Sequence, residues 1–168
     1  GGYAIFTSHT LQPGFYSLGV KYGQLAIIVL FLTLLPGIFS RFGLQFKQVL
    51  FIRVFRRQFG VTVFWLAFTH FHLVRQFYRL AGIMPLTFPL PLFEVIGSTA
   101  LFLMTFMWLT SNNLSVAKLG PWWKRLHRVI YVILWLILFH TALQRLSIWS
   151  IIAGSIAFLE ITSWIYYF

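Results

Sequence analysis

Five long apolar runs constrain this chain more than any other feature. A helix needs about 20 predominantly apolar residues to cross a bilayer, and 60% of the 168 residues are hydrophobic while only 9% are charged. The sequence therefore predicts an all-α integral membrane protein, with five transmembrane helices in one bundle and residues 1–168 forming a single transmembrane domain. The runs lie at Val20 to Phe39, Phe59 to Phe77, Leu92 to Leu109, Leu126 to Leu143 and Ser147 to Phe168.

The basic residues predict how these helices are oriented. The formal net charge is +11, and two connections hold most of the 13 Lys and Arg: five in residues 40–58 and four in residues 110–128, nine in all. A nucleic-acid interface would gather such residues in one stripe or patch, whereas membrane proteins keep basic loops in the cytoplasm. We expect no nucleic-acid partner, an N-terminus outside and a C-terminus inside, in a prokaryotic inner membrane or its organellar equivalent.

Three histidines, His70, His127 and His140, lie inside the apolar runs, where a polar side chain needs a partner. The chain has no cysteine, which excludes thiolate haem ligation and cysteine-held iron–sulfur clusters. Any redox centre would therefore use histidine, and a haem iron is one good partner for two imidazoles. The alternative is that each histidine separately hydrogen-bonds a carbonyl or hydroxyl of an adjacent helix.

Two of these histidines, His70 and His140, are expected to lie at the same depth in the membrane. His70 follows Arg57 by 13 residues and His140 follows Arg125 by 15, which correspond to helix rises of roughly 20 Å and 22 Å. Both helices are expected to run outward, so the two imidazoles lie at one level near the outer face. Matched depth favours a haem b clamped between them with both imidazoles as axial metal ligands, and separate hydrogen bonds to adjacent helices stay the alternative.

We expect different roles for His127 and His72. His127 lies near the inner interface, where it is a candidate ligand of a second haem; the alternative is a histidine solvated by lipid headgroups. His72 is two residues from His70 and therefore about 200° around the helix. It is interpreted as a structural or partner-facing residue.

Three charged residues, Arg75, Arg145 and Glu160, lie in or beside the apolar runs and are also expected to have partners. Arg75 and Arg145 each follow a predicted ligand by five positions, and we expect them to pair with haem propionates; the alternative is that they anchor helix ends at the interface. Glu160 lies within the last apolar run, where a carboxylate should be paired or protonated. Arg128 and His127 are its expected partners, and this structural pair is favoured over a proton relay or a quinone site.

The predicted outer connection, Met84 to Leu92, contains three prolines. These exclude a continuous helix and favour an extended hairpin near the interface.

Two other functions fit the composition. The chain is compatible with a non-redox structural or antenna-organising subunit of a larger membrane complex, because its aromatic content and short loops suit packing against other helices or pigments. A transporter built around Glu160 is less favoured. Transporters commonly bind substrate and ions at a pair of broken helices, whereas this sequence shows no such pair and only one acid well inside a predicted span.

Two segments resemble a known family. Residues 109–131, LTSNNLSVAKLGPWWKRLHRVIY, resemble the T-S…L-G-x-x-W-x-x-L-H-x-x-x-Y signature of the ferric-reductase-like transmembrane domain, in particular of its MsrQ (YedZ)-type haem-binding subunits. RRQFGVTVFWLAFTH, Arg56 to His70, is similar to the R-R-x-x-G…H helix of that family, and His140 falls where its next histidine is expected. The resemblance covers about Gly19 to Thr141. The additional N-terminal helix usual in MsrQ proteins has no counterpart in this sequence, and His72 is extra.

The resemblance implies that His70, His127 and His140 are haem-associated. It further implies an electron-transfer subunit of an oxidoreductase system rather than a complete enzyme. Electrons would come from a cytosolic flavin reductase or from quinol and pass across the membrane to an outside redox partner, such as a molybdopterin methionine sulfoxide reductase.

Overall fold

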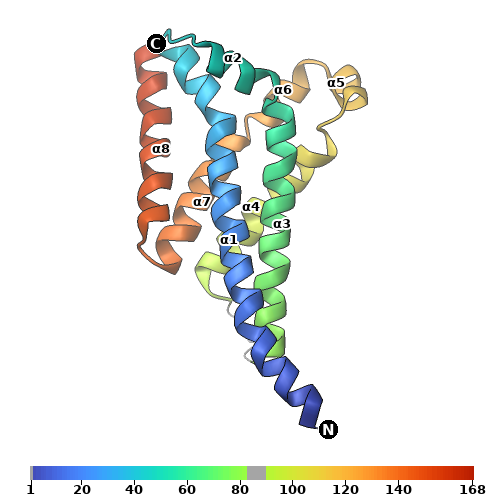
Figure 1. The fold of residues 1–168 in the computed structure, drawn as a ribbon. Coiled ribbons are helices and arrows are strands. Elements are labelled where there is room, and N and C mark those ends of the chain that lie inside the picture. The colour runs from blue at the N-terminus through green and yellow to red at the C-terminus, as the bar shows by residue number, and fades with distance from the viewer. Residues whose placement is uncertain (1, 83–89) are drawn as a thin grey trace.

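The chain folds into a bundle of antiparallel helices. The computed structural model describes residues 2–82 and 90–168, with side chains from residue 14 onward, and all regular structure in these residues is helical. Five long helices alternate in direction, so that the N-terminus lies at one end of the bundle and the C-terminus at the other (Figure 1). These helices are α1 (Gly2–Arg41), α3 (Arg56–Leu80), α4 (Leu92–Leu109), α7 (Ile130–Gln144) and α8 (Ile148–Tyr167).

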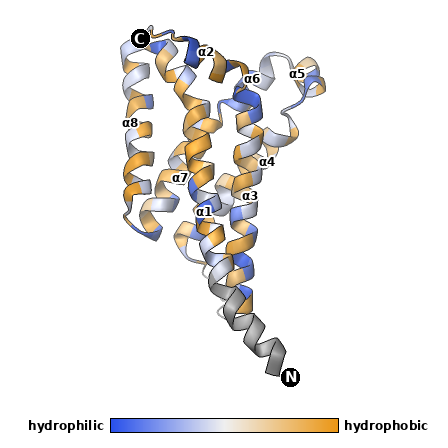
Figure 2. Ribbon diagram, viewed as in Figure 1, coloured by the Kyte–Doolittle hydropathy of each residue, from blue (hydrophilic) through white to orange (hydrophobic). Residues whose placement is uncertain are grey.

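Three short helices lie at the C-terminal end of the bundle (Figure 1). They are α2 (Lys47–Val54), α5 (Asn113–Leu119) and α6 (Pro121–His127). They occupy the two connections that carry nine of the thirteen basic residues, and Figure 2 shows hydrophilic residues gathered along this end. Both basic connections are therefore on the same side of the bundle, as the charge distribution predicts.

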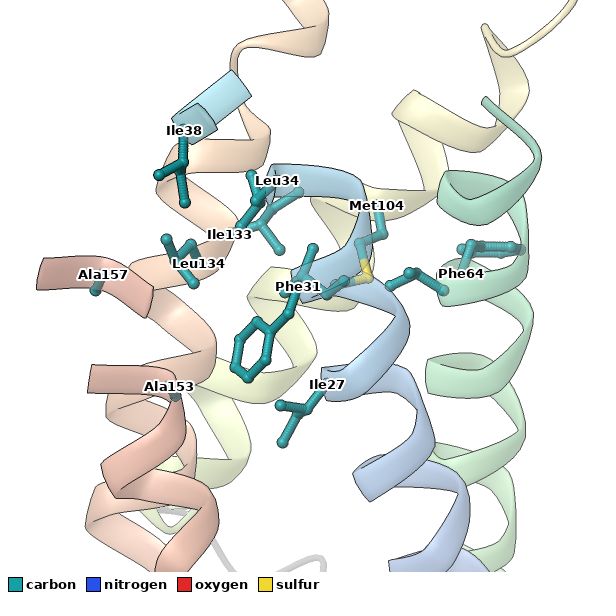
Figure 3. Close-up of a cluster of buried hydrophobic side chains, with 12 residues drawn as sticks. Ile27, Phe31, Leu34, Ile38, Phe64, Met104, Ile133, Leu134, Ala153 and Ala157 are labelled. Carbon is teal, nitrogen blue, oxygen red and sulfur yellow. The ribbon is translucent and has the colours of Figure 1, made fainter. Parts of the chain in front are cut away.

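Helix α1 forms the centre of the apolar core. Its buried side chains recur every three or four residues, which places them on one helical face: Ile27, Leu30, Phe31, Leu34 and Ile38. Figure 3 shows these α1 side chains meeting residues of the four other long helices. The partners include Phe64 of α3, Met104 of α4, Ile133 and Leu134 of α7, and Ala153 and Ala157 of α8.

Small side chains let α8 approach the rest of the bundle. Ala153, Ala157 and Ser163 are at most 1% exposed, and α8 packs against both α1 and α7. Without a hydrophobic driving force in lipid, membrane helices associate through such close backbone packing.

Large apolar side chains cover the outside of the bundle. Phe102, Phe106, Ile151, Phe158 and Ile165 are all at least 45% exposed, which suits contact with lipid chains rather than water. Within the described part of the chain, four stretches are long and apolar enough to cross a membrane: Gly14–Arg41, Leu92–Leu109, Pro121–Gln144 and Ile148–Tyr167. The chain is an integral membrane protein.

Helix α3 is the exception among the long helices. It has 25 residues, yet it is not one of those four stretches. Its basic residues and histidines lower its hydropathy, although it packs extensively along α1. The number of membrane crossings is therefore five only if α3 also spans the membrane.

The helix boundaries differ from the apolar runs in two places. Helix α1 begins at Gly2 rather than Val20, and where its side chains are described it packs against α3, as in the contact between the Tyr16 and Phe77 rings at 5.0 Å. The expected helix from Leu126 to Leu143 is interrupted: α6 ends at His127 and α7 begins at Ile130. Short-range hydrogen bonds, including one from the Val129 N–H to the Leu126 carbonyl at 3.1 Å, form this break. The expected proline hairpin, Met84 to Leu92, lies mostly outside the described residues.

A buried ion pair joins α1 to α8 at the basic end. The Arg41 guanidinium pairs with the Glu160 carboxylate and donates from Nε to the Ser163 hydroxyl at 2.8 Å. The Trp164 indole N–H donates to Oε1 of Glu160 at 3.2 Å. The guanidinium carbon of Arg41 lies 4.7 Å from the centre of the Trp164 ring. The expectation that Glu160 is paired is confirmed, but its expected partners, Arg128 and His127, are wrong. The helical path of α8 brings Glu160 beside the last turn of α1 instead.

We predict that removing one charge of this pair destabilises the bundle more than removing both. R41M leaves a buried carboxylate without its counter-ion, and breaking a buried pair in this way costs about 3–5 kcal/mol. The double variant R41M/E160M removes both charges and should recover most of the loss. Thermal unfolding in detergent, followed by helical circular dichroism, measures the difference.

E94Q provides the matched control, because Glu94 and Arg75 lie 3.9 Å apart with partly exposed side chains, and such pairs contribute about 1 kcal/mol or less. An R41M protein that unfolds at the wild-type temperature would contradict the assigned role of the pair.

Candidate functional site

Two histidines from separate helices meet in a cavity of about 460 Å³. His70 comes from α3 and His140 from α7, and their ring centroids are 6.4 Å apart with the ring planes at 80°. Cofactor pockets commonly measure about 300–1,000 Å³. The two imidazoles expected at one level therefore lie side by side in the cavity, with their ring planes near perpendicular.

Each ring is fixed by a backbone carbonyl of a different helix. The His70 Nδ1 lies 2.7 Å from the Gly19 carbonyl oxygen of α1, and the His140 Nδ1 lies 2.7 Å from the Phe93 carbonyl oxygen of α4. A carbonyl oxygen only accepts hydrogen bonds, so each Nδ1 must carry the proton and donate it. A neutral imidazole then has its lone pair on Nε2, which bonds to no described residue in either ring.

The helix packing explains this arrangement. Helix α3 packs most extensively on α1, and α7 packs most extensively on α4. The site therefore consists of two similar halves, α1 with α3 and α4 with α7, and each half supplies one histidine and one carbonyl. The apolar part of the cavity wall includes Ile27, Val63 and Met104, which are buried.

Two glycines make room for the rings. A Cβ atom at position 23 would lie 2.8 Å from the His70 Nδ1, and one at position 97 would lie 2.6 Å from the His140 Nδ1. Any other residue at these positions would push the ring aside. The residue patterns considered in the sequence do not identify these two glycines, although the Gly19-x-x-x-Gly23 spacing is a known signal for close helix contact.

The two predicted arginines differ in their surroundings. Both line the cavity, together with Glu94. Arg75 is within 3.9 Å of that carboxylate and lies 5.4 Å from the centre of the Phe71 ring. The Arg145 guanidinium is exposed and makes no hydrogen bond or ion pair with any described residue. Arg145 is thus the freer of the two to bind an anionic group.

His127 lies outside the paired site, at the basic end. Its ring stacks on Trp123, with centroids 4.1 Å apart, and its Nε2 lies 3.2 Å from the Thr110 hydroxyl. The Trp123 indole donates to the Thr110 carbonyl at 2.9 Å. Nδ1 of His127 has no hydrogen bond to a described residue, so this nitrogen is available as a ligand.

His72 faces away from the pair, as its position in the helix predicts. It is exposed, and its Nδ1 donates back to the Phe68 carbonyl of its own helix at 2.9 Å. It therefore has the character of a structural residue on the outer surface of α3.

The paired histidines fit a metal ion held between two imidazoles. With metal–nitrogen bonds of about 2 Å, the ring centroids on opposite sides of the ion would lie roughly 6 Å apart, which matches the observed 6.4 Å. In the described part of the chain, no group of three or more His, Cys, Asp or Glu side chains gathers as a metal site. A two-imidazole site suits a metal whose remaining ligands come from a macrocycle, as in haem.

Comparison with known proteins finds relatives that are named as heme-binding subunits. The chain is similar to the protein-methionine-sulfoxide reductase heme-binding subunit MsrQ of Brucella ovis, Brucella anthropi and Brucella canis, with 36% identity to each over 81 residues. The match covers 46% of this chain and 36% of each relative, so it spans little more than a third of the relatives' length. No family model and no solved structure matches the chain.

Proposed function

We propose that this chain is a b-type cytochrome subunit that carries electrons across a membrane, with His70 and His140 as the axial ligands of one haem. The observation that carries the proposal is the facing pair of imidazoles, each with its Nδ1–H on a backbone carbonyl. Similarity to relatives named as haem-binding subunits supports the same cofactor.

The residues of the site contribute orientation, basicity and exclusion of water. Each carbonyl holds one imidazole in the tautomer that leaves Nε2 free, and it raises the electron donation of that ring. When bound, haem supplies one-electron iron chemistry that needs no proton at the histidines. The buried apolar side chains around the rings keep the surroundings of low polarity, which tunes the reduction potential.

Arg145 is proposed to bind a haem propionate, with Arg75 in support. Both residues line the cavity. Arg75 lies near the end of α3 and Arg145 directly follows α7, and both helix ends are opposite the basic connections (Figure 1). A guanidinium forms two parallel hydrogen bonds with a carboxylate. Because Glu94 partly neutralises Arg75, Arg145 is expected to provide the stronger contact.

The proposed topology places this haem near the outer face. If α3 is the fifth crossing, the positive-inside rule places α2, α5 and α6 in the cytoplasm and the N-terminus outside. We infer that the donor, a cytosolic flavin reductase or quinol, delivers electrons from the basic side. The acceptor would be an outside redox protein, and the MsrQ relatives, named as subunits of a methionine-sulfoxide reductase, suggest its class.

We further propose His127 as the ligand of a second haem near the basic side. His127 ends α6, at the basic end of the bundle, whereas His70 and His140 lie further along α3 and α7 (Figure 1). A second haem at His127 would therefore shorten each electron-transfer step. The free Nδ1 and the flat Trp123 neighbour support this role. No second histidine is at hand there among the described residues, so this haem would be five-coordinate or use another kind of ligand.

The paired site is tested by a reduced-minus-oxidised absorption spectrum of the purified chain. We expect a b-type band, and we expect H70A and H140A each to lose the low-spin signal, because each removes one of two axial ligands. H72A is the matched control, since it removes a neighbouring histidine on the outer surface of α3 and should keep the signal.

A chain without a b-type band would contradict the cytochrome proposal and favour a structural or antenna-organising subunit. Persistence of the low-spin signal in both H70A and H140A would contradict the assigned ligand pair.

The second site is tested by haem content per chain. We expect two haems in the wild type and one in H127A, with the low-spin signal of the outer pair unchanged. Chemical extraction and quantification of haem, with H72A again as control, makes the comparison. Equal haem content in H127A and the wild type would remove the second site and leave the first intact.

A further inference from the structure

The two halves of the histidine site repeat one local geometry. In α1, the Gly19 carbonyl accepts from His70, and the position four residues later is Gly23. In α4, the Phe93 carbonyl accepts from His140, and the position four residues later is Gly97. In both helices the acceptor and the glycine are therefore one turn apart on the same face.

The spacing has a direct physical reason. Inside an α-helix, a carbonyl already accepts the N–H of the residue four positions on, so the histidine uses the second lone pair of the same oxygen. To reach that oxygen, the ring must lie over the residue that donates the first bond. A Cβ atom there would be 2.8 Å from Nδ1 at position 23 and 2.6 Å at position 97, so the hydrogen bond needs glycine.

We propose that Gly23 and Gly97 are positioning residues that hold the His70 and His140 imidazoles on their carbonyls with the ring planes near perpendicular. This inference rests on the proposed ligation of haem by the two histidines. The observed angle between the planes is 80°, and each ring is held by its own helix pair, so neither ring can turn without losing its hydrogen bond.

The geometry has an electronic consequence. Perpendicular imidazole planes donate π density to two different iron d orbitals, which therefore stay close in energy, and the low-spin ferric ion then has a strongly anisotropic g tensor. The carbonyl hydrogen bonds act in addition, because they increase electron donation from the ligands and stabilise the ferric state. The glycines thus control both the spectrum and the reduction potential without touching the iron.

The test uses the haem-loaded chain and the variants G23A and G97A. Electron paramagnetic resonance of the wild type should show a strongly anisotropic low-spin signal. In each variant this signal should be lost, replaced by a less anisotropic or a high-spin signal. Where a low-spin haem remains, its midpoint potential in a redox titration should rise, because the ring is displaced from its acceptor.

Two glycines provide matched controls. A Cβ atom at Gly60, in the same helix as His70, would meet nothing within 4 Å, and one at Gly154 of α8 would make an ordinary contact of 3.7 Å with Leu138. G60A and G154A should keep the wild-type signal and potential. All four substitutions make the same chemical change and raise helix propensity, so a general effect of alanine would appear in the controls too.

The wild-type spectrum tests the inference even if a variant does not fold. A low-spin signal of low anisotropy in the wild type would indicate near-parallel rings and overturn the inference while leaving histidine ligation intact. Unchanged signals in both G23A and G97A would overturn it in the same way. A wild-type chain that binds no haem would overturn the proposed function, and this inference with it.

Discussion

The hydrogen bond from each imidazole Nδ1 to a backbone carbonyl is the interaction on which the proposed site depends. A histidine in an apolar bundle must satisfy its N–H, and a helix offers few acceptors, because its carbonyls are already bonded within the helix. His70 and His140 both solve this by sharing a carbonyl of a neighbouring helix. The carbonyl accepts the Nδ1–H hydrogen bond of each ring, and Nε2 has no hydrogen bond to a described residue.

This interaction also accounts for the two similar halves of the histidine site. Sharing a carbonyl requires the ring to approach another helix backbone closely, and glycine allows this approach in α1 and in α4. The same glycine-lined contact lies within the extensive packing of α1 on α3, where Val74 would be 2.9 Å from a Cβ atom at Gly19. Close helix packing and histidine orientation therefore have a common cause.

The other end of the bundle is organised by charge. The buried pair of Arg41 and Glu160 fastens α8 to α1, and Arg57 donates to the Ser111 carbonyl at 2.8 Å and to Asn113 at 2.7 Å, joining α3 to the turn after α4. These contacts hold the basic connections at one end, away from the histidine pair. The proposed electron path across the membrane needs this separation of ends, because the proposed donor and acceptor act on opposite sides.

The sequence predicts the helices and the level of the histidines, since both follow from hydropathy and from the constant rise of a helix. Hydropathy does not predict that α1 begins before Val20, or the break after His127, which depends on local hydrogen bonds. Nor does it predict that Glu160 meets Arg41, because contacts between distant segments depend on how helices are rotated and arranged. For the same reason the roles of Gly23 and Gly97 emerge only when α1 and α4 are seen against the rings.

We propose that His70 and His140 together hold one iron ion through Nε2. Electron–nuclear double resonance on the ferric, haem-loaded chain, with ¹⁵N introduced only at histidine, tests it most directly because it detects nitrogens bonded to the metal. We expect strong couplings from two histidine nitrogens at the low-spin iron, and an exchangeable proton on the far nitrogen of each ring. Coupling to a single histidine nitrogen, or to none, would contradict it.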